Sequence, residues 1–204
     1  MWSILSKKIK TILFWGLIVA CLSGGVSLLF PWQYSAETQL LIISRNSYGA
    51  DPSTQVQSAE RVGNSLTQII GTSDFYKKVM ENQEASFNKE RWNNYTERQR
   101  RKHWQKDLTA SMVYGTGLLR LVAYSGTQED AVALSSSAAK VLALRAFEYV
   151  GGDLAVKIVS DPIASRFPAR PNFILNVILG FAAGVILSVL AIAYKHRHHH
   201  FVFG

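Results

Sequence analysis

The residues best suited to bind a ligand form one basic, aromatic-rich run near the middle of the chain. The run RWNNYTERQRRKHWQK, residues 91–106, interleaves cationic and aromatic side chains. Guanidinium and ammonium groups pair with anionic oxygens, and aromatic rings offer stacking surfaces. One interpretation is contact with an anionic glycan or a lipid-linked sugar phosphate through Arg98, Arg100, Arg101, Lys102 and Trp104. The alternative, which we favour, is a solvated helix whose aromatic residues pack on the domain or on a neighbouring subunit.

Side chains that serve in catalysis are present, but their spacing is not catalytic. Glu129 and Asp130 stand at the expected start of a helix, so we interpret them as helix-terminal residues rather than as an acid/base pair. His103 has no second His or Cys at ligand spacing, which argues against a metal site. The serines at 135–137 lack the G-x-S-x-G context of a nucleophile elbow. We therefore expect no enzyme, no metal and no cofactor.

Two long uncharged segments are expected to position this domain at a membrane. They are residues 11–30 and 173–194. A helix of about twenty residues, at about 1.5 Å per residue, crosses a hydrocarbon core of about 30 Å. The first segment has a basic start and could be a cleaved signal peptide. Its apolar part is too long for a typical signal, however, and no A-x-A-like site follows before Trp32, so we expect a retained anchor.

The two spans set the expected domain organisation. The chain of 204 residues divides into a tail at 1–10, a span at 11–30, a domain at 31–160, a proline-rich segment at 161–172, a span at 173–194 and a tail at 195–204. The tails are basic and hold no acid, which by the positive-inside rule puts both termini in the cytoplasm. Arg166 and Arg170 flank the second span on the other side and are the one local disagreement.

The pattern of apolar residues between the spans predicts a small mixed α/β extracytoplasmic domain. Strands are expected at 34–44, 117–125 and 154–161, and helices at 56–70, 73–82, 88–107 and 127–150. Thr127 is the expected cap of the last helix. Residues 31–172 hold 17 basic and 14 acidic residues, so the formal charge of +8 belongs largely to the tails and does not indicate a nucleic-acid partner. Cys21, the single cysteine, excludes an intrachain disulfide.

Small and polar residues in the spans predict close helix packing. Gly180 and Gly184 form a G-x-x-x-G pattern, and Gly24 and Gly25 lie in the first span. Small residues let helix backbones approach, although glycine also occurs in membrane helices by chance. Asn176 is expected to hydrogen-bond across helices.

The stretch DPIASRFPARPN carries three prolines immediately before the second span: Pro162, Pro168 and Pro171. Proline fixes φ, removes a hydrogen-bond donor and favours extended geometry in the preceding residue. We expect this segment to follow an extended path and to set the angle between the domain and the second span.

Taken together, these features resemble the Wzz-type chain-length-determinant family, the polysaccharide co-polymerases. The resemblance is carried, in order, by YSAETQLLI after the first span, SLTQIIGTSDFYKKVM, LLRLVAYSGTQEDAVALSSSAAKVL, and FPARPN running into a glycine-containing span. It implies a homo-oligomeric scaffold of the cytoplasmic (inner) membrane that regulates chain length, polymerisation or export of a bacterial surface polysaccharide. Lipopolysaccharide O-antigen, capsule and exopolysaccharide all remain open, and the implied partners are a polysaccharide polymerase or the glycan chain itself.

The chain departs from part of the family, because its prolines are unevenly spaced, its domain is short and it has no G-x-x-x-x-G-K-[ST] motif. It resembles compact members whose tyrosine kinase, if any, is a separate polypeptide. The resemblance then implies that the C-terminal tail contacts such a kinase, with Phe201 and Phe203 as candidates. The alternative is simple attraction of Lys195 and Arg197 to anionic lipid. A two-span sensor or receptor with a separately encoded output partner is the rival function, although few residues follow Tyr194.

Overall fold

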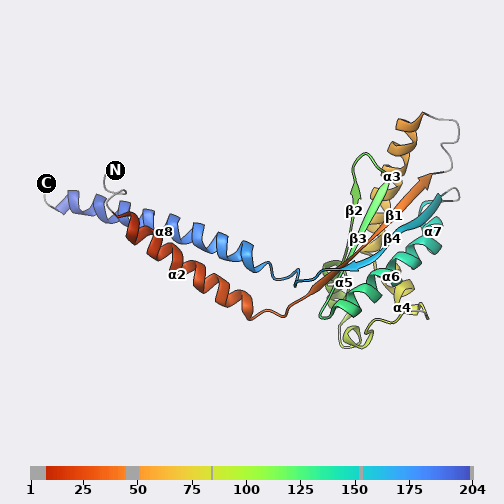
Figure 1. Ribbon diagram of the computed structural model, residues 1–204, viewed down its shortest axis with the longest axis horizontal. Helices are drawn as coiled ribbons and strands as arrows, with labels where there is room; N and C mark the ends of the chain where they lie inside the picture. Colours follow the sequence, from red (N-terminus) through yellow and green to blue (C-terminus); the bar gives the residue numbers. More distant parts are fainter. Residues whose placement is uncertain (1–7, 45–50, 84, 152–153, 203–204) are drawn as a thin grey trace. The chain divides into compact units, whose positions relative to one another are not determined.

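The computed structural model describes residues 8–44, 51–83, 85–151 and 154–202 (Figure 1). The chain forms two units. One combines the two ends of the chain, Met1–Trp32 and Arg170–Gly204, and the other is the continuous segment Gln33–Ala169. The predicted fold class, two apolar helices flanking a small α/β domain, is confirmed.

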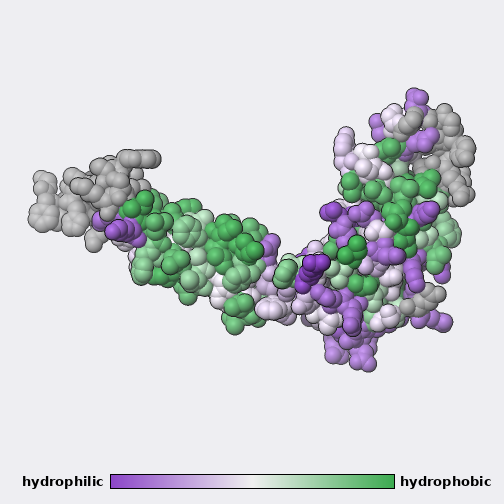
Figure 2. Space-filling view, in the orientation of Figure 1, coloured by the Kyte–Doolittle hydropathy of each residue, from purple (hydrophilic) through white to green (hydrophobic). Residues whose placement is uncertain are grey.

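The first unit is built from α2 (Ile9–Leu28) and α8 (Phe173–Val202). Both helices are long and apolar enough to cross a membrane, α2 over its full length and α8 over Phe173–Tyr194. Leu17 and Ile186 are each 59% exposed and are two of many apolar side chains that point away from the pair. Figure 2 shows the resulting hydrophobic surface over both helices. Such a surface is unfavourable in water and is suited to hydrocarbon.

The second unit contains an antiparallel sheet with the strand order β2-β3-β1-β4. Its strands are β1 (Tyr34–Ser44), β2 (Leu108–Val113), β3 (Leu118–Ser125) and β4 (Leu154–Ala164). The strand β2 was not predicted, because small and polar residues such as Thr109 and Ser111 hide its alternation. Gly115 and Gly117 adopt positive φ in the turn that joins β2 to β3.

The helices of this unit are α3 (Pro52–Ile70), α4 (Ser73–Glu81), the 3-10 helix η2 (Glu90–Trp92), α5 (Glu97–Asp107), α6 (Gln128–Arg145) and α7 (Phe147–Val150). The single helix predicted over 88–107 is therefore wrong. A turn at 93–95 interrupts it, and Thr96 starts α5 through a capping box with Gln99. The helix predicted over 127–150 begins at its expected cap, Thr127, but divides into α6 and α7.

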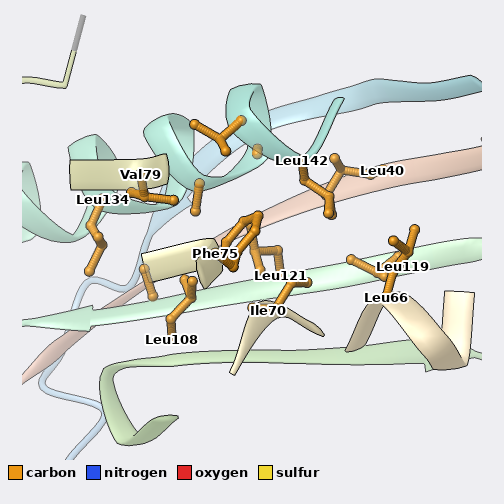
Figure 3. Close-up of a cluster of buried hydrophobic side chains, with 14 of the residues drawn as sticks. Leu40, Leu66, Ile70, Phe75, Val79, Leu108, Leu119, Leu121, Leu134 and Leu142 are labelled. Carbon is orange, nitrogen blue, oxygen red and sulfur yellow. The ribbon is translucent and has the colours of Figure 1, made fainter. Parts of the chain in front are cut away.

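The core of the domain lies between one face of the sheet and the helices. α6 packs against β1, β3 and β4, and α3 packs against β1 and β2. Figure 3 shows leucines from the sheet and from the helices meeting around Phe75. Thr38 and Ser135 are fully buried but share a hydrogen bond of 2.7 Å between their hydroxyls, so this polar pair is satisfied within the core.

The two chain ends of the domain lie side by side. The Ser165 N–H donates to the carbonyl oxygen of Ser35 at 2.8 Å, and the Ala169 N–H donates to that of Gln33 at 2.7 Å. The sheet therefore continues as a short paired segment to the point where both strands leave the domain.

Candidate functional site

The basic run predicted to contact a glycan lies mainly on α5. Arg98, Arg101 and Lys102 are exposed, whereas Arg100 is partly buried. None of these four forms an ion pair with a residue that the structure describes. The helix thus presents cations that form no ion pair among the described residues, which is the electrostatic character expected of an anion-contacting surface.

The aromatic residues of the run pack in the core. Trp104 is fully buried, and its indole N–H donates to the Ile70 carbonyl oxygen at 2.7 Å. Its ring lies 5.7 Å from that of Trp92 and 5.2 Å from that of Tyr76, measured between centroids. Burial of this kind excludes glycan stacking on Trp104 and corrects its assignment as a contact residue. The alternative that we favoured from the sequence was that the aromatic residues of the run pack on the domain. Trp92 and Trp104 do so.

Arg100 joins α5 to this aromatic cluster. Its guanidinium carbon lies 5.8 Å from the Tyr76 ring centroid, and Nη2 donates to the Tyr95 carbonyl oxygen at 3.0 Å. Its Nε is enclosed and has no hydrogen-bond partner among the described residues. Burial raises the pKa of the Tyr76 hydroxyl above its ordinary value, an effect that the nearby Arg100 partly opposes.

A small cavity of about 20 Å³ lies between α4 and α5. It is lined by Thr72, Ser73, Tyr76, Lys77, Glu97, Arg100, Arg101 and Trp104. Thr72 is the N-cap of α4: its hydroxyl accepts from the Phe75 N–H and donates to the Ile69 carbonyl oxygen. Ser73 and Lys77 were missed as site residues because α4 meets α5 only in the folded chain. A basic pair, Lys77–Lys78, is the only hint of them in the sequence.

A larger polar cavity of about 720 Å³ lies where β3 runs into α6. It is lined by Ser86, Phe87, Asn88, Arg91, Ser125, Gly126, Thr127, Glu129, Asp130 and Ala133. Arg91 forms an ion pair of 2.7 Å with Asp107, and its Nη1 donates to the Ser125 hydroxyl at 2.9 Å. That hydroxyl bonds to Asp130, whose second oxygen accepts from the Asn88 N–H at 2.6 Å. These interactions tie η2 to β3 and α6.

Glu129 and Asp130 lie in the first turn of α6, as predicted for helix-terminal residues. The hydroxyl of Thr127 accepts from the Asp130 N–H at 3.2 Å. His103 stacks on Tyr95 with 4.3 Å between ring centroids. Within the described ranges, no group of three or more His, Cys, Asp or Glu side chains is arranged to hold a metal ion.

A charged network that sequence reasoning missed joins α4 to α7. Lys78 Nζ lies 2.5 Å from Glu148 and 3.2 Å from Asp74, and the Tyr149 hydroxyl donates to Asp74 at 2.5 Å. Hydrogen bonds from Tyr149 and Lys78 lower the pKa of Asp74, and those from Lys78 and Arg145 lower the pKa of Glu148. The same bond to Glu148 raises the pKa of Lys78. The network holds neighbouring helices together rather than forming a reactive site.

The small residues of the spans lie at the contact between α2 and α8 of one chain. A Cβ added at Gly184 would lie 2.9 Å from both Gly16 Cα and Val19 Cβ. One added at Gly180 would lie 2.6 Å from Ser23 Cβ. Both contacts are closer than real side chains permit, so the two backbones approach only because these positions are glycine.

Polar side chains reinforce the same contact. The Ser23 hydroxyl donates to the Asn176 carbonyl oxygen at 2.8 Å, and Asn176 Nδ2 donates to the Ser27 hydroxyl at 3.0 Å. In the first span, Gly24 faces Val177 and Phe173, whereas a Cβ at Gly25 would meet nothing within 4 Å. Only one of the two adjacent glycines is therefore part of the helix contact.

The three prolines occupy different environments. Pro162 lies within β4 rather than after it, because this edge strand extends to Ala164. The pairing with β1 shifts register nearby, on either side of Gln39. Proline is tolerated at such places because the lost N–H breaks no regular ladder. Pro168 precedes Ala169, whose N–H donates to the carbonyl oxygen of Gln33. The peptide bond between Arg170 and Pro171 is cis.

One of the two predicted kinase contacts falls within α8. Phe201 belongs to the backbone of this helix, and Phe203 lies outside the described residues. Their assignment rests on the sequence alone.

Residues 1–83 match a protein-family model, Wzz, described as chain length determinant protein. The matched segment contains α2, β1, α3 and α4, and so includes Ser73 and Lys77 of the small cavity. No curated protein matches the chain. The resemblance drawn from YSAETQLLI and SLTQIIGTSDFYKKVM is confirmed by this match.

Proposed function

We propose that this chain is a non-catalytic membrane scaffold that regulates the chain length, polymerisation or export of a bacterial surface polysaccharide. The match of residues 1–83 to the chain-length-determinant family carries the proposal. The architecture supports it, since two apolar helices flank a small α/β domain in the sequence. Lipopolysaccharide O-antigen, capsule and exopolysaccharide are the candidate polymers.

The domain lies outside the cytoplasmic (inner) membrane in this proposal, with both termini in the cytoplasm. Its support is the basic, acid-free composition of residues 1–10 and 195–204. The domain meets the polymerase or the growing glycan through exposed Arg98, Arg101 and Lys102, together with Arg100. Anionic groups of a glycan would pair with these side chains without displacing an existing ion pair.

The scaffold acts as a homo-oligomer. Since Gly180, Gly184 and Asn176 face α2 of the same chain, contacts between subunits involve other surfaces, such as the apolar outer faces of α2 and α8. The tail that carries Phe201 and Phe203 reaches the cytoplasmic side, where it engages a separate tyrosine kinase in those cells that have one. Cross-linking in native membranes tests the assembly, and a strictly monomeric species contradicts it.

A two-span sensor is the second candidate. The polar cavity of about 720 Å³ favours it, because its volume lies in the range of about 300–1,000 Å³ that small-molecule sites occupy. A sensor also needs a separately encoded output partner.

Deletion of the gene, followed by gel analysis of surface polysaccharide, tests the leading proposal. We expect an altered length distribution or yield that the wild-type gene restores. A complementing variant with Pro168→Ala and Pro171→Ala should insert normally but leave the polymer altered, because the two prolines constrain the path of the chain into α8. An unchanged polymer after deletion contradicts the proposal, and wild-type polymer from the variant reduces the segment to a spacer.

A further inference from the structure

The small cavity between α4 and α5 has an excess of positive charge. Lys77, Arg100 and Arg101 line it together with one carboxylate, Glu97. None of the three cations forms an ion pair with a residue in the described part of the chain. Arg91 in the larger cavity is different, since it lies 2.7 Å from Asp107. Of these two cavities, only the smaller is lined by cations that form no ion pair with a described residue.

Arg100 lines this wall with a guanidinium whose orientation the fold sets. Its guanidinium is held by the Tyr95 carbonyl oxygen and lies near the Tyr76 ring, so its orientation is set by the fold. Its Nε is nevertheless enclosed and bonds to no described residue. A guanidinium carries five N–H donors, and the Tyr95 carbonyl oxygen accepts from one of them, so Arg100 keeps other donors for an oxygen placed in the cavity that it lines.

The dimensions of the cavity restrict what enters it. Its volume of about 20 Å³ holds about one water-sized atom. An incoming group can therefore place one oxygen inside while its other oxygens stay at the rim, where the exposed side chains of Lys77 and Arg101 are located. Ser73 lines the same cavity, and a serine hydroxyl can donate to an anionic oxygen.

From these observations, we propose that the cavity between α4 and α5 binds a phosphoryl or pyrophosphoryl group through Arg100, Arg101, Lys77 and Ser73. Three cations and one carboxylate leave a net charge of two, which a doubly charged phosphate oxyanion balances and a single carboxylate does not. Arginine, lysine and hydroxyl groups are typical ligands of phosphate oxygens. The pocket rests on geometry, whereas its biological ligand, a phosphate carried by a sugar or a lipid, rests on the proposed function.

Titration of inorganic pyrophosphate into the full-length chain, purified in a detergent with a neutral head group, tests the site by calorimetry. We expect saturable binding with one equivalent at about 0.15 M salt, where diffuse surface attraction is largely screened. The double variant Lys77→Gln and Arg101→Gln should weaken binding about tenfold for each cation removed, which corresponds to one charge-assisted contact. Both side chains are exposed, so their replacement should leave folding unchanged.

The control carries Arg61→Gln and Lys157→Gln, two exposed residues outside the cavity, and loses the same net charge. It should bind pyrophosphate within about twofold of wild type, because charge alone is not the determinant. Equal weakening in both double variants, absence of saturable binding to wild type, or tighter binding of glucuronate than of pyrophosphate would each overturn the site.

Two further arms separate the sources of phosphate. If anionic phospholipid occupies the pocket, pyrophosphate binding is lost in nanodiscs of anionic phospholipid and kept in nanodiscs of zwitterionic lipid. That result assigns the pocket to a lipid head group. Equal binding in both assigns it to a sugar phosphate. The site and the proposed function also fail separately. A chain that sets glycan length without binding pyrophosphate overturns only the site, and one that binds pyrophosphate without affecting the glycan overturns only the function.

Discussion

Replacement of Gly184 by alanine tests the idea that α2 and α8 depend on one backbone contact. The new Cβ would lie 2.9 Å from Gly16 Cα and Val19 Cβ, and 3.0 Å from the Trp15 carbonyl oxygen. Favourable carbon–carbon contacts lie at about 3.5–4.0 Å, so the helices must separate locally by about 0.6–1 Å. Two of the opposing atoms belong to backbone, and no rotamer change can absorb this shift.

The expected cost follows from that displacement. A gap of about 0.5–1 Å removes about a quarter to a half of the attraction between facing atoms. Overpacked sites in protein cores lose about 1–3 kcal/mol. The hydrogen bonds between Ser23 and Asn176 and between Asn176 and Ser27 would lengthen as well. We therefore expect Gly184→Ala to destabilise the helix pair by about 1–3 kcal/mol relative to its control.

Gly25→Ala is the matched control, because a Cβ at Gly25 would meet nothing within 4 Å. Both substitutions replace glycine by alanine in an apolar helix, so the gain in helix propensity is common to them and cancels in the difference. The assay titrates SDS into detergent-solubilised protein and follows energy transfer between one fluorophore on each helix. A Gly184→Ala chain as stable as the Gly25→Ala chain would refute the reasoning.

The remaining predictions concern the domain. Trp104→Ala should destabilise it by about 3–5 kcal/mol in urea unfolding, because a fully buried indole and its hydrogen bond are lost; an unchanged midpoint would contradict burial. Thr127→Ala should cost about 1 kcal/mol in the same assay, since it removes the N-cap of α6. Asp74 and Glu148 have lowered pKa values, so their stabilisation is present at neutral pH and is lost as pH falls through the acidic range of carboxylates. The melting temperature should fall more steeply with acidification in wild type than in Lys78→Met, and parallel curves would count against the network.

Strong local patterns allowed most of the domain to be predicted. The stretch YSAETQLLIIS alternates clearly and is a strand over the predicted residues, 34–44. Thr127 followed by two acids marks the start of α6. The strand β2 escaped prediction because one set of alternate positions includes the small Ala110 and the other mixes polar Thr109 and Ser111 with apolar Val113, so neither period dominates. Pro162 belongs to a strand because β4 is an edge with an irregular register, which no local pattern reveals.

Only the part of the candidate site whose charged residues are close together in the sequence could be predicted. The basic residues of α5 stand together in the sequence, and their exposure follows from that. The burial of Trp104 depends on α4, which precedes it by more than twenty residues and places Tyr76 against its ring. The contribution of Ser73 and Lys77 arises in the same way. Contacts between elements, rather than properties of either element, decide which cations surround a cavity.

The two ends of the domain are neighbours, because Ser165 bonds to Ser35 and Ala169 bonds to Gln33 through the backbone. The segment between the two spans could therefore be exchanged as one unit. A segment whose two ends emerge as neighbours requires only that its replacement has neighbouring ends too. Lengthening or exchange at positions beyond this exit, such as the β2–β3 turn at Tyr114, leaves the hairpin of α2 and α8 covalently unaltered. Chimeras joined at Gln33 and Ala169 should therefore insert as two-span proteins, which protease accessibility of the exchanged domain in intact cells would check.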